Sequence, residues 1–422
     1  MGSCRSVRWG MCCVAVAGLA LVPACSSSFD VLTAPPPPEG VTLPILSEIA
    51  LIVDAQVNGQ ATRVLLDTGT VLTSMASPGA IDRLGLEAAG ANPFAGAEDG
   101  GVGICGSGAA TLDPTRYTAR SLNLGGVVFE NVALTVLNET DYDTFAETGV
   151  DLILAAQFLM YTDWKIEEGG RQLVLLPLNS RQRPAGAMDM RATGPISFAP
   201  LLDAKIGAMS VAVSYNDAAP LDSGLDTGAS VLFAVSDQAA SQDGWDPATL
   251  PHVDLQVFGA GADCPETLFR GTRVKLGEQA YDRPLVLEIQ GSGATALVGW
   301  PFFTSHDSVY VAPGGQWIEF VKSATTDALV AEPLRWFEAT LFFNADGKYE
   351  VGAVVDGSSA AQQGVVAGDI VLEIDGVSLD TVEGKSLLFG PTPAREGHVD
   401  FLIQDSSGAT RTVTLTAQVR LE

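Results

Sequence analysis

Apolar and polar residues alternate along much of the chain with the two-residue period typical of β-strands. Apolar side chains occupy every second position from 49 to 57, and a second strand-like run follows at 62–66. The dipeptide Asn58-Gly59 between these runs is a strong hairpin signal. Helical patterns are short, as over 78–84. The pattern therefore predicts a mainly β protein.

The same order of elements occurs twice. In each copy an apolar run leads into an Asp-Thr-Gly triplet, first at Asp67 and again, 159 residues later, at Asp226. Chance yields such a triplet roughly once in several thousand residues, so two in similar contexts are informative. We interpret the repeat as a duplication, with a first lobe at 44–182 and a second lobe at 195–322.

Two further features recur at matching places. A Gly-rich stretch follows each triplet, and Cys105 and Cys264 each lie 38 residues after their own aspartate. Each copy then contains an apolar strand before a short helix, with Ala155 in the first copy and Gly299 in the second. These offsets strengthen the interpretation as a duplication.

The first residues form a targeting segment. A positive region with Arg5 and Arg8 precedes a short apolar stretch, and Leu21-Val22-Pro23-Ala24-Cys25 ends it. The segment resembles a bacterial lipoprotein signal, which implies removal of residues 1–24, lipidation of Cys25 and a place in the bacterial cell envelope, on the periplasmic or outer-surface face. The alternative is a plain secretory signal. Residues 25–43, with four consecutive prolines, are expected to form an extended tether.

Composition limits the possible partners. The 422 residues carry a net charge of −27, which disfavours binding to nucleic-acid phosphates. The three histidines are dispersed without metal-ligand spacing, and neither a serine-nucleophile elbow nor a P-loop occurs. We therefore expect neither a metal nor a cofactor.

The triplets resemble the active-site loops of aspartic peptidases, in particular the retropepsin-like family with its Asp-Thr-Gly-Ala-Ser sequence. The resemblance implies two β-barrel lobes related by a pseudo-twofold axis, a monomer that acts on polypeptides, and Asp67 and Asp226 as the catalytic pair. It also implies that two threonines brace the loops by hydrogen bonds to the opposite backbone. The supporting loop residues would be Thr68, Gly69, Thr70, Thr227, Gly228, Ala229 and Ser230.

Two adjacent carboxylates cannot both ionise easily, so such a pair shares a proton. One member can then activate water while the other protonates the peptide carbonyl. Because a Thr70 hydroxyl can bond to Asp67 and Ala229 offers none, we expect the charge on Asp67 and the proton on Asp226. A competing triplet, Asp222-Ser223-Gly224, is less favoured because no apolar strand follows it directly.

The Gly-rich stretches correspond, by the same resemblance, to flaps that close over a bound peptide. Cys105 and Cys264 are expected on these flaps or at their bases, either bridged as a disulfide, which an exported protein permits, or as separate thiols. The flap candidates are Gly103, Ile104, Cys105, Gly261 and Cys264.

Residues 333–422 are expected to form a further domain. The stretch 357–376, with its Ala-rich helix, Gly-Asp turn and Ile-Asp-Gly hairpin, resembles a PDZ domain, a small β-barrel with short helices. That resemblance implies a peptide ligand laid along a sheet edge near 340–343. A clear Gly-rich carboxylate motif is missing there. The leading hypothesis is thus a membrane-tethered endopeptidase whose PDZ domain recruits substrates, and the alternative is a weakly active peptide-binding scaffold.

Overall fold

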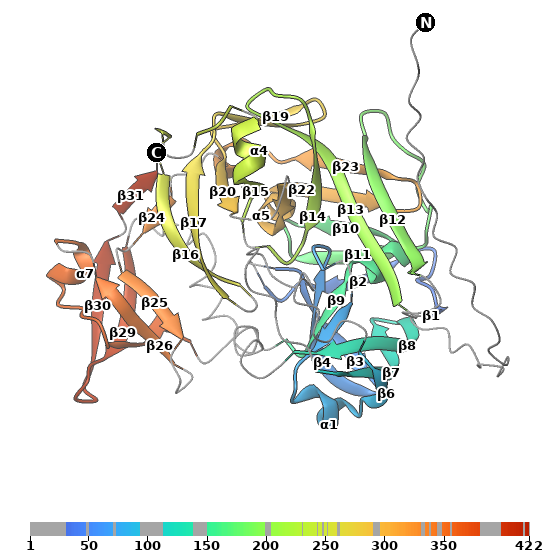
Figure 1. The fold of residues 1–422 in the computed structure, drawn as a ribbon, viewed down its shortest axis with the longest axis horizontal. Helices are drawn as coiled ribbons and strands as arrows, with labels where there is room; N and C mark the ends of the chain where they lie inside the picture. The colour runs from blue at the N-terminus through green and yellow to red at the C-terminus, as the bar shows by residue number, and fades with distance from the viewer. Residues whose placement is uncertain are drawn as a thin grey trace, which may run out of the picture.

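The computed structural model describes residues 31–47, 50–70, 73–92, 113–137, 150–198, 204–229, 231–242, 244–246, 249–250, 252–259, 262–289, 296–330, 334–336, 339–343, 348–354, 357–379, 398–416 and 418–421. Strands dominate this part of the chain, which confirms the prediction of a mainly β protein (Figure 1). The helices are α1 (Ala80–Leu84), η1 (Ala156–Tyr161), α4 (Asp237–Gln242), α5 (Trp300–Thr304), α6 (Thr326–Val330) and α7 (Ser359–Gln362).

The first lobe is built on a sheet that closes on itself. Its strands follow the order β1-β8-β5-β9-β4-β3-β7-β6, and an additional pairing of β7 with β8 closes it. The predicted hairpin turn is present, with positive φ at Asn58 and Gly59. The strands are β1 (Val31–Ala34), β3 (Ile52–Val57), β4 (Gln60–Asp67), β5 (Ser74–Ala76), β6 (Glu87–Ala91), β7 (Thr115–Leu124), β8 (Val127–Val136) and β9 (Leu152–Ala155).

A larger sheet contains the second lobe and continues into the first. Strands β10 and β11 form a hairpin, and β10 also pairs with β22 of the second lobe, with Trp164 opposite Val311. The strands are β2 (Val41–Pro44), β10 (Asp163–Glu167), β11 (Gln172–Leu176), β12 (Met188–Phe198), β13 (Ala204–Tyr215), β14 (Leu221–Asp226), β15 (Phe233–Ser236), β16 (His252–Gly259), β17 (Ala262–Arg270), β18 (Arg273–Leu276), β19 (Gln279–Asp282), β20 (Leu285–Ile289), β21 (Ala296–Gly299), β22 (His306–Ala312) and β23 (Trp317–Lys322).

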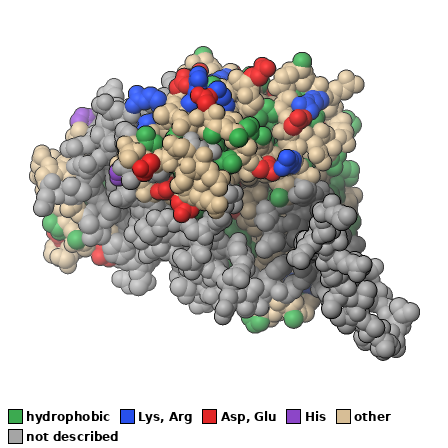
Figure 2. Space-filling model, turned by 45° about the horizontal axis from the view of Figure 1, so that its top comes forward, with side chains coloured by type: hydrophobic (Ala, Val, Ile, Leu, Met, Phe, Trp, Pro, Cys, Tyr) green, Lys and Arg blue, Asp and Glu red, His purple; other side chains and the backbone are tan. Residues whose placement is uncertain are grey.

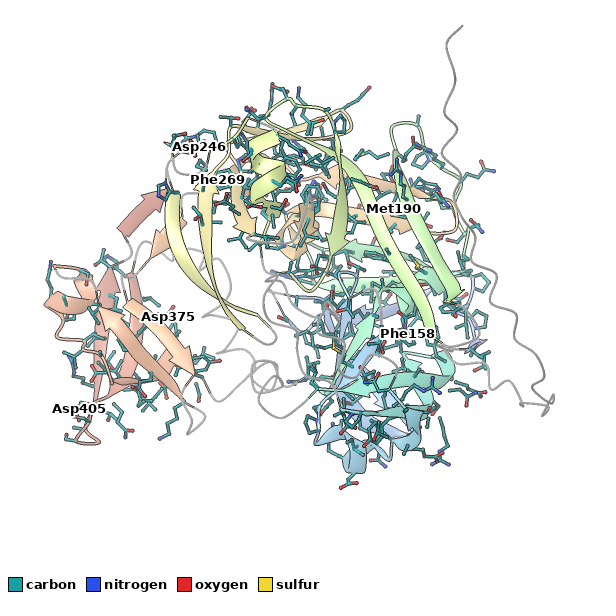
Figure 3. The ribbon with its side chains drawn as sticks, in the orientation of Figure 1. Phe158, Met190, Asp246, Phe269, Asp375 and Asp405 are labelled. Atoms are coloured by element: carbon teal, nitrogen blue, oxygen red, sulfur yellow. The ribbon has the colours of Figure 1, made fainter. Side chains whose placement is uncertain are left out.

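One hydrophobic core extends across both lobes. Trp164 of β10 stacks on Phe303 of α5, with ring centroids 6.0 Å apart, and Trp300 stacks on the same phenylalanine. All three rings are fully buried. Burial of large aromatic rings is worth several kcal/mol, so this stack holds the lobes in a fixed relation. Figure 3 labels Phe158 in the first lobe and Phe269 in the second.

The described part of 25–43, which was expected to be an extended tether, pairs with both sheets. Residues 31–34 form β1, which pairs with β8, and residues 41–44 form β2, which pairs with β11. The segments on either side of the prolines are rich in Val, Leu and Thr, which favour strands and bury well at a sheet edge. Gly40 between them has φ +84°, and a Cβ there would lie 2.9 Å from the Leu175 carbonyl oxygen.

The C-terminal domain has its own core. Its buried residues run from Tyr349 to Leu415 and form a cluster separate from that of the lobes. Ser358 caps α7 by accepting a bond from the Ala361 N–H. Figure 3 labels Asp375 and Asp405 in this domain. Its strands are β24 (Leu334–Trp336), β25 (Ala339–Phe343), β26 (Tyr349–Val354), β27 (Ile370–Ile374), β28 (Val377–Ser378), β29 (His398–Gln404), β30 (Thr410–Thr416) and β31 (Gln418–Leu421).

Charged side chains of both signs lie close together on the surface. Figure 2 shows basic groups beside acidic ones on the face in view. Exposed ion pairs include Arg273 with Asp282, whose N and O atoms are 3.0 Å apart. Within the described residues, no helix has the length and apolar character needed to cross a membrane.

Candidate active site

The two predicted aspartates end equivalent strands. Asp67 is the last residue of β4 and Asp226 the last of β14. Each of these strands has a parallel neighbour, so that Asp67 lies opposite Ala155 of β9 and Asp226 opposite Gly299 of β21. The same local pairing therefore presents a carboxyl group from each lobe.

The two threonines tie the loops together by reciprocal bonds. The Thr68 Oγ1 donates to the Leu225 carbonyl at 2.7 Å, and the Thr227 Oγ1 donates to the Leu66 carbonyl. Each hydroxyl also accepts from the opposite backbone: Thr68 N–H to Thr227 Oγ1 at 3.1 Å, and Thr227 N–H to Thr68 Oγ1 at 3.0 Å. Both side chains are buried, so these bonds do not compete with solvent. The loops exchange bonds as a local twofold relation would require, although the pseudo-twofold relation of the whole lobes stays a prediction.

The two glycines allow each loop to approach the opposite aspartate. A Cβ at Gly69 would overlap the Asp226 carboxyl group, and one at Gly228 would lie 2.8 Å from Asp67 Oδ1. Any side chain on either glycine would therefore displace the carboxyl group of the other lobe.

The Asp67 carboxylate is half-buried and receives three hydrogen bonds from its own loop. Its Oδ1 accepts from the Gly69 N–H at 2.8 Å and the Thr70 N–H at 3.2 Å, and its Oδ2 accepts from the Thr70 hydroxyl at 2.6 Å. The predicted Thr70 hydroxyl bond is thus present. The hydroxyl contact has no counterpart in the other loop, where Ala229 offers only its backbone N–H.

The Asp226 carboxyl group is more deeply buried, with 8% of the residue exposed. Burial, the negative charge of Asp67 and a hydrogen bond with the Asp67 carboxylate, in that order, raise the pKa of Asp226 well above its usual value. Two backbone donors oppose this shift, Gly228 N–H at 2.9 Å and Ala229 N–H at 3.0 Å, both to Oδ1. The geometry therefore favours a proton on Asp226.

The competing triplet lies outside this arrangement. Asp222 is exposed and forms an ion pair with Arg191 at 2.7 Å. Its neighbour Ser223 is buried inside the second lobe.

Most of the predicted flap residues lie outside the part of the chain that the structure describes. Ser230, Gly103, Ile104, Cys105, Gly261 and Cys25 lie outside the described residues. Cys264 is on β17, opposite Val257 of β16 and two residues beyond the Gly259–Ala262 pair that ends this hairpin. The Cys105–Cys264 disulfide stays a prediction. In the part of the chain that is described, no group of three or more His, Cys, Asp or Glu side chains could hold a metal ion.

Sequence reasoning missed Ser74. This fully buried residue of β5 accepts a bond from the Ala155 N–H at 3.0 Å. The one available signal was Ala155 itself, because alanine stands where the other copy has glycine.

Two family models match parts of this chain. Residues 53–158 match the family model for aspartyl protease, and residues 350–389 match that for the PDZ domain. No match was found among curated proteins. The chain therefore carries a retropepsin-like region and a PDZ domain, as predicted.

Similar solved structures include proteins of both kinds. A retropepsin-like aspartic protease from Rickettsia conorii is 15% identical over 25% of this chain and 80% of its own, with a TM-score of 0.19. A PDZ domain protein from Parabacteroides distasonis is 21% identical over 21% of this chain, with a TM-score of 0.19, and the match spans only 21% of that protein. An HtrA-type protease, AlgW with decapeptide, is 10% identical over 62% of this chain and 72% of its own, with a TM-score of 0.23.

Proposed function

We propose that this chain is a membrane-tethered aspartic endopeptidase that works as a monomer. The observation that carries the proposal is the hydrogen-bonded pair of Asp67 and Asp226, delivered by two lobes of one chain and braced by Thr68 and Thr227. A protein that only bound peptides would need no shared proton between two carboxyl groups at the meeting point of its lobes.

The environments of the two aspartates support different roles for them. The ionised Asp67 takes a proton from a water molecule as its oxygen attacks the peptide carbonyl carbon, while Asp226 gives its proton to the carbonyl oxygen. Breakdown of the tetrahedral diol returns a proton to Asp226 as the C–N bond breaks, and the leaving nitrogen takes the proton held by Asp67. Both carboxyl groups then regain their starting states.

The PDZ domain is proposed to recruit substrates. Its strand β25 lies at one end of the sheet and pairs only with β26 among the described strands, so its other edge suits addition of an extended peptide. The separate core of this domain supports a test by truncation. Removal of residues 333–422 should preserve cleavage of short peptides and slow cleavage of folded or long substrates.

The membrane anchor is proposed at Cys25. Only five residues separate this cysteine from β1, which bounds the reach of the linking segment to about 17 Å. The lipid would thus hold the first lobe close to the bilayer. Fatty-acid labelling that is lost in Cys25→Ser, together with release of the protein from membranes, would support the anchor, and unchanged membrane association would contradict it.

The decisive experiment is a digest of casein and a peptide library between about pH 3 and 7. Cleavage that a hydroxyl-bearing transition-state isostere blocks would support the endopeptidase. Addition of reductant tests whether a flap disulfide restricts entry. Peptide binding without any cleavage, in both redox states, would favour the scaffold alternative.

A further inference from the structure

The two lobes hold their aspartate loops by different bonds, although the surrounding registers match. In the second lobe the Gly299 N–H donates to the Leu232 carbonyl at 3.0 Å. A Cβ at Gly299 would overlap the Val231 carbonyl oxygen and lie 2.9 Å from that of Ala229. The φ of Gly299, −92°, suits any residue, so this close approach alone requires glycine.

The first lobe has alanine at the equivalent register and a different acceptor. The Ala155 N–H donates to the Ser74 hydroxyl at 3.0 Å, and both residues are buried. The residue at the place of Ser74 in the second lobe, Phe233, is a core aromatic without an acceptor. Ser74 therefore supplies, from a side chain, the acceptor that the backbone supplies beside Gly299.

This bond belongs to a short chain of contacts that reaches Asp67. The next amide, Ala156 N–H, donates to the Thr70 carbonyl at 2.9 Å. Thr70 in turn donates to Asp67 from its N–H and from its hydroxyl. In the second lobe the Trp300 N–H donates to the Ala229 carbonyl at 2.8 Å. This hydrogen bond is therefore common to both lobes.

We infer that Ser74 is a positioning residue for Asp67. Ala155 stands where the second lobe has glycine, and the Ser74 hydroxyl supplies the acceptor for its N–H, so we call Ser74 and Ala155 a compensated pair. This inference rests on the proposed peptidase function. Without the hydroxyl, the buried Ala155 N–H loses its acceptor, and the strand can restore it only by moving relative to the Thr70 loop. The Asp67 carboxylate would move with that loop.

The test compares Ser74→Ala with Thr135→Val. Thr135 is a matched control because its buried hydroxyl donates to the backbone carbonyl of Ser74, at 3.3 Å, whereas the Ser74 hydroxyl accepts from the Ala155 N–H. We expect Ser74→Ala to lower kcat by about tenfold or more with little change in KM, since small displacements of a reacting group are costly. The acidic limb of the activity–pH profile of Ser74→Ala should move to higher pH. Thr135→Val should show neither effect at comparable Tm.

One further variant and one further measurement test the role of Ser74 beyond the kinetics of the single variants. Ser74→Ala combined with Ala155→Gly should recover much of the lost kcat, because glycine allows the closer backbone approach seen at Gly299. Hydrogen exchange should show faster exchange of the Ala155 amide in Ser74→Ala than in Thr135→Val. Equal kinetics and equal exchange in the two single variants would overturn the inference while leaving the peptidase proposal intact.

An inactive wild type would instead contradict the peptidase proposal. In that case the affinity for a hydroxyl-bearing peptide isostere, measured by calorimetry, tests Ser74 separately. An affinity weakened in Ser74→Ala but not in Thr135→Val supports the positioning role, and equal affinities reject it.

Discussion

The two aspartate loops have the same backbone arrangement, but their carboxyl groups lie in different electrostatic environments. Asp67 is half-buried and accepts three hydrogen bonds from its loop, including one from the Thr70 hydroxyl. Asp226 is nearly buried, accepts two from its loop, and faces the charge of Asp67, so its pKa is raised. Local symmetry brings the carboxyl groups together, and the differences around them decide which one holds the proton.

The largest expected effect comes from removing one member of the pair. Asp226→Asn should lower kcat/KM by about 10³-fold or more, because an amide can neither share nor transfer the proton. Steady-state cleavage of a fluorogenic peptide measures the loss. Asp222→Asn is the matched control, since that residue lies in the competing triplet and only forms an exposed ion pair. A reversed outcome, with Asp222→Asn inactive, would reject the assignment.

The second lobe should tolerate less change behind its aspartate than the first. Gly299→Ala forces a methyl group against the Val231 carbonyl, so we expect a loss of roughly 3 kcal/mol in the free energy of unfolding. Ala155→Gly only removes a methyl group beside a retained N–H bond, and should cost about 1 kcal/mol. Urea unfolding measures both changes. Equal costs would show that the two strands are held in the same way, against the difference in bonding described above.

Local signals in the sequence predicted the loops well and their connections poorly. The Asn58-Gly59 hairpin, the helix near residues 80–84 and the Thr68–Thr227 brace follow from turn chemistry or from the resemblance carried by a short motif. The pairing of β10 with β22 joins segments more than 140 residues apart, and no local pattern encodes it. Docking of β1 and β2 was missed because the prolines between them favoured a free tether.

Ser74 illustrates a second limit of sequence reasoning. A serine in an apolar run has no visible role until its partner, the Ala155 N–H, is known. The alanine at 155 was recognised as a departure from glycine, but its compensation depends on a contact between strands 81 residues apart. Compensated pairs of this kind become visible only from tertiary structure.

The second lobe should also be the more sensitive to acid. His306, which begins β22 after α5, is buried, and its ring contacts Phe302, Tyr281 and Phe320. The pKa of His306 is lowered to about 4, mainly by burial and to a smaller extent by Lys322, while the Phe302 carbonyl, Asp327 and Asp307 oppose the shift. The folded state therefore binds this proton more weakly than the unfolded chain.

The sign of the pH dependence follows from that difference. Above pH 6.5 the histidine is neutral in both states, so it contributes no pH dependence. As the pH falls from about 6.5 to about 4, only the unfolded chain gains the proton, and this should remove about 3 kcal/mol from the free energy of unfolding. His306→Gln should flatten the curve of stability against pH in this window. His252→Gln, at an exposed position, is the control, and equal curves for the two variants would contradict this account.

The smallest and sharpest test addresses the inequality of the two aspartates directly. Thr70→Ala removes the hydroxyl that bonds to Asp67 Oδ2 at 2.6 Å and so weakens the preference for charge on Asp67. We expect the acidic limb of the kcat/KM profile to move to higher pH, with a loss of up to about tenfold in kcat/KM at low pH, because charge-assisted bonds are worth about 1.5–3 kcal/mol and water replaces part of this one. Thr70→Ser keeps the hydroxyl and should restore the profile, whereas Thr70→Ala with Ala229→Thr would move the hydroxyl to the loop of Asp226.

In neutron diffraction the wild-type proton should lie on Asp226. A proton on Asp67 would reject the assignment of the two carboxyl groups. A wild-type profile in Thr70→Ala would show that the hydroxyl does not set the asymmetry and that the deeper burial of Asp226 acts alone.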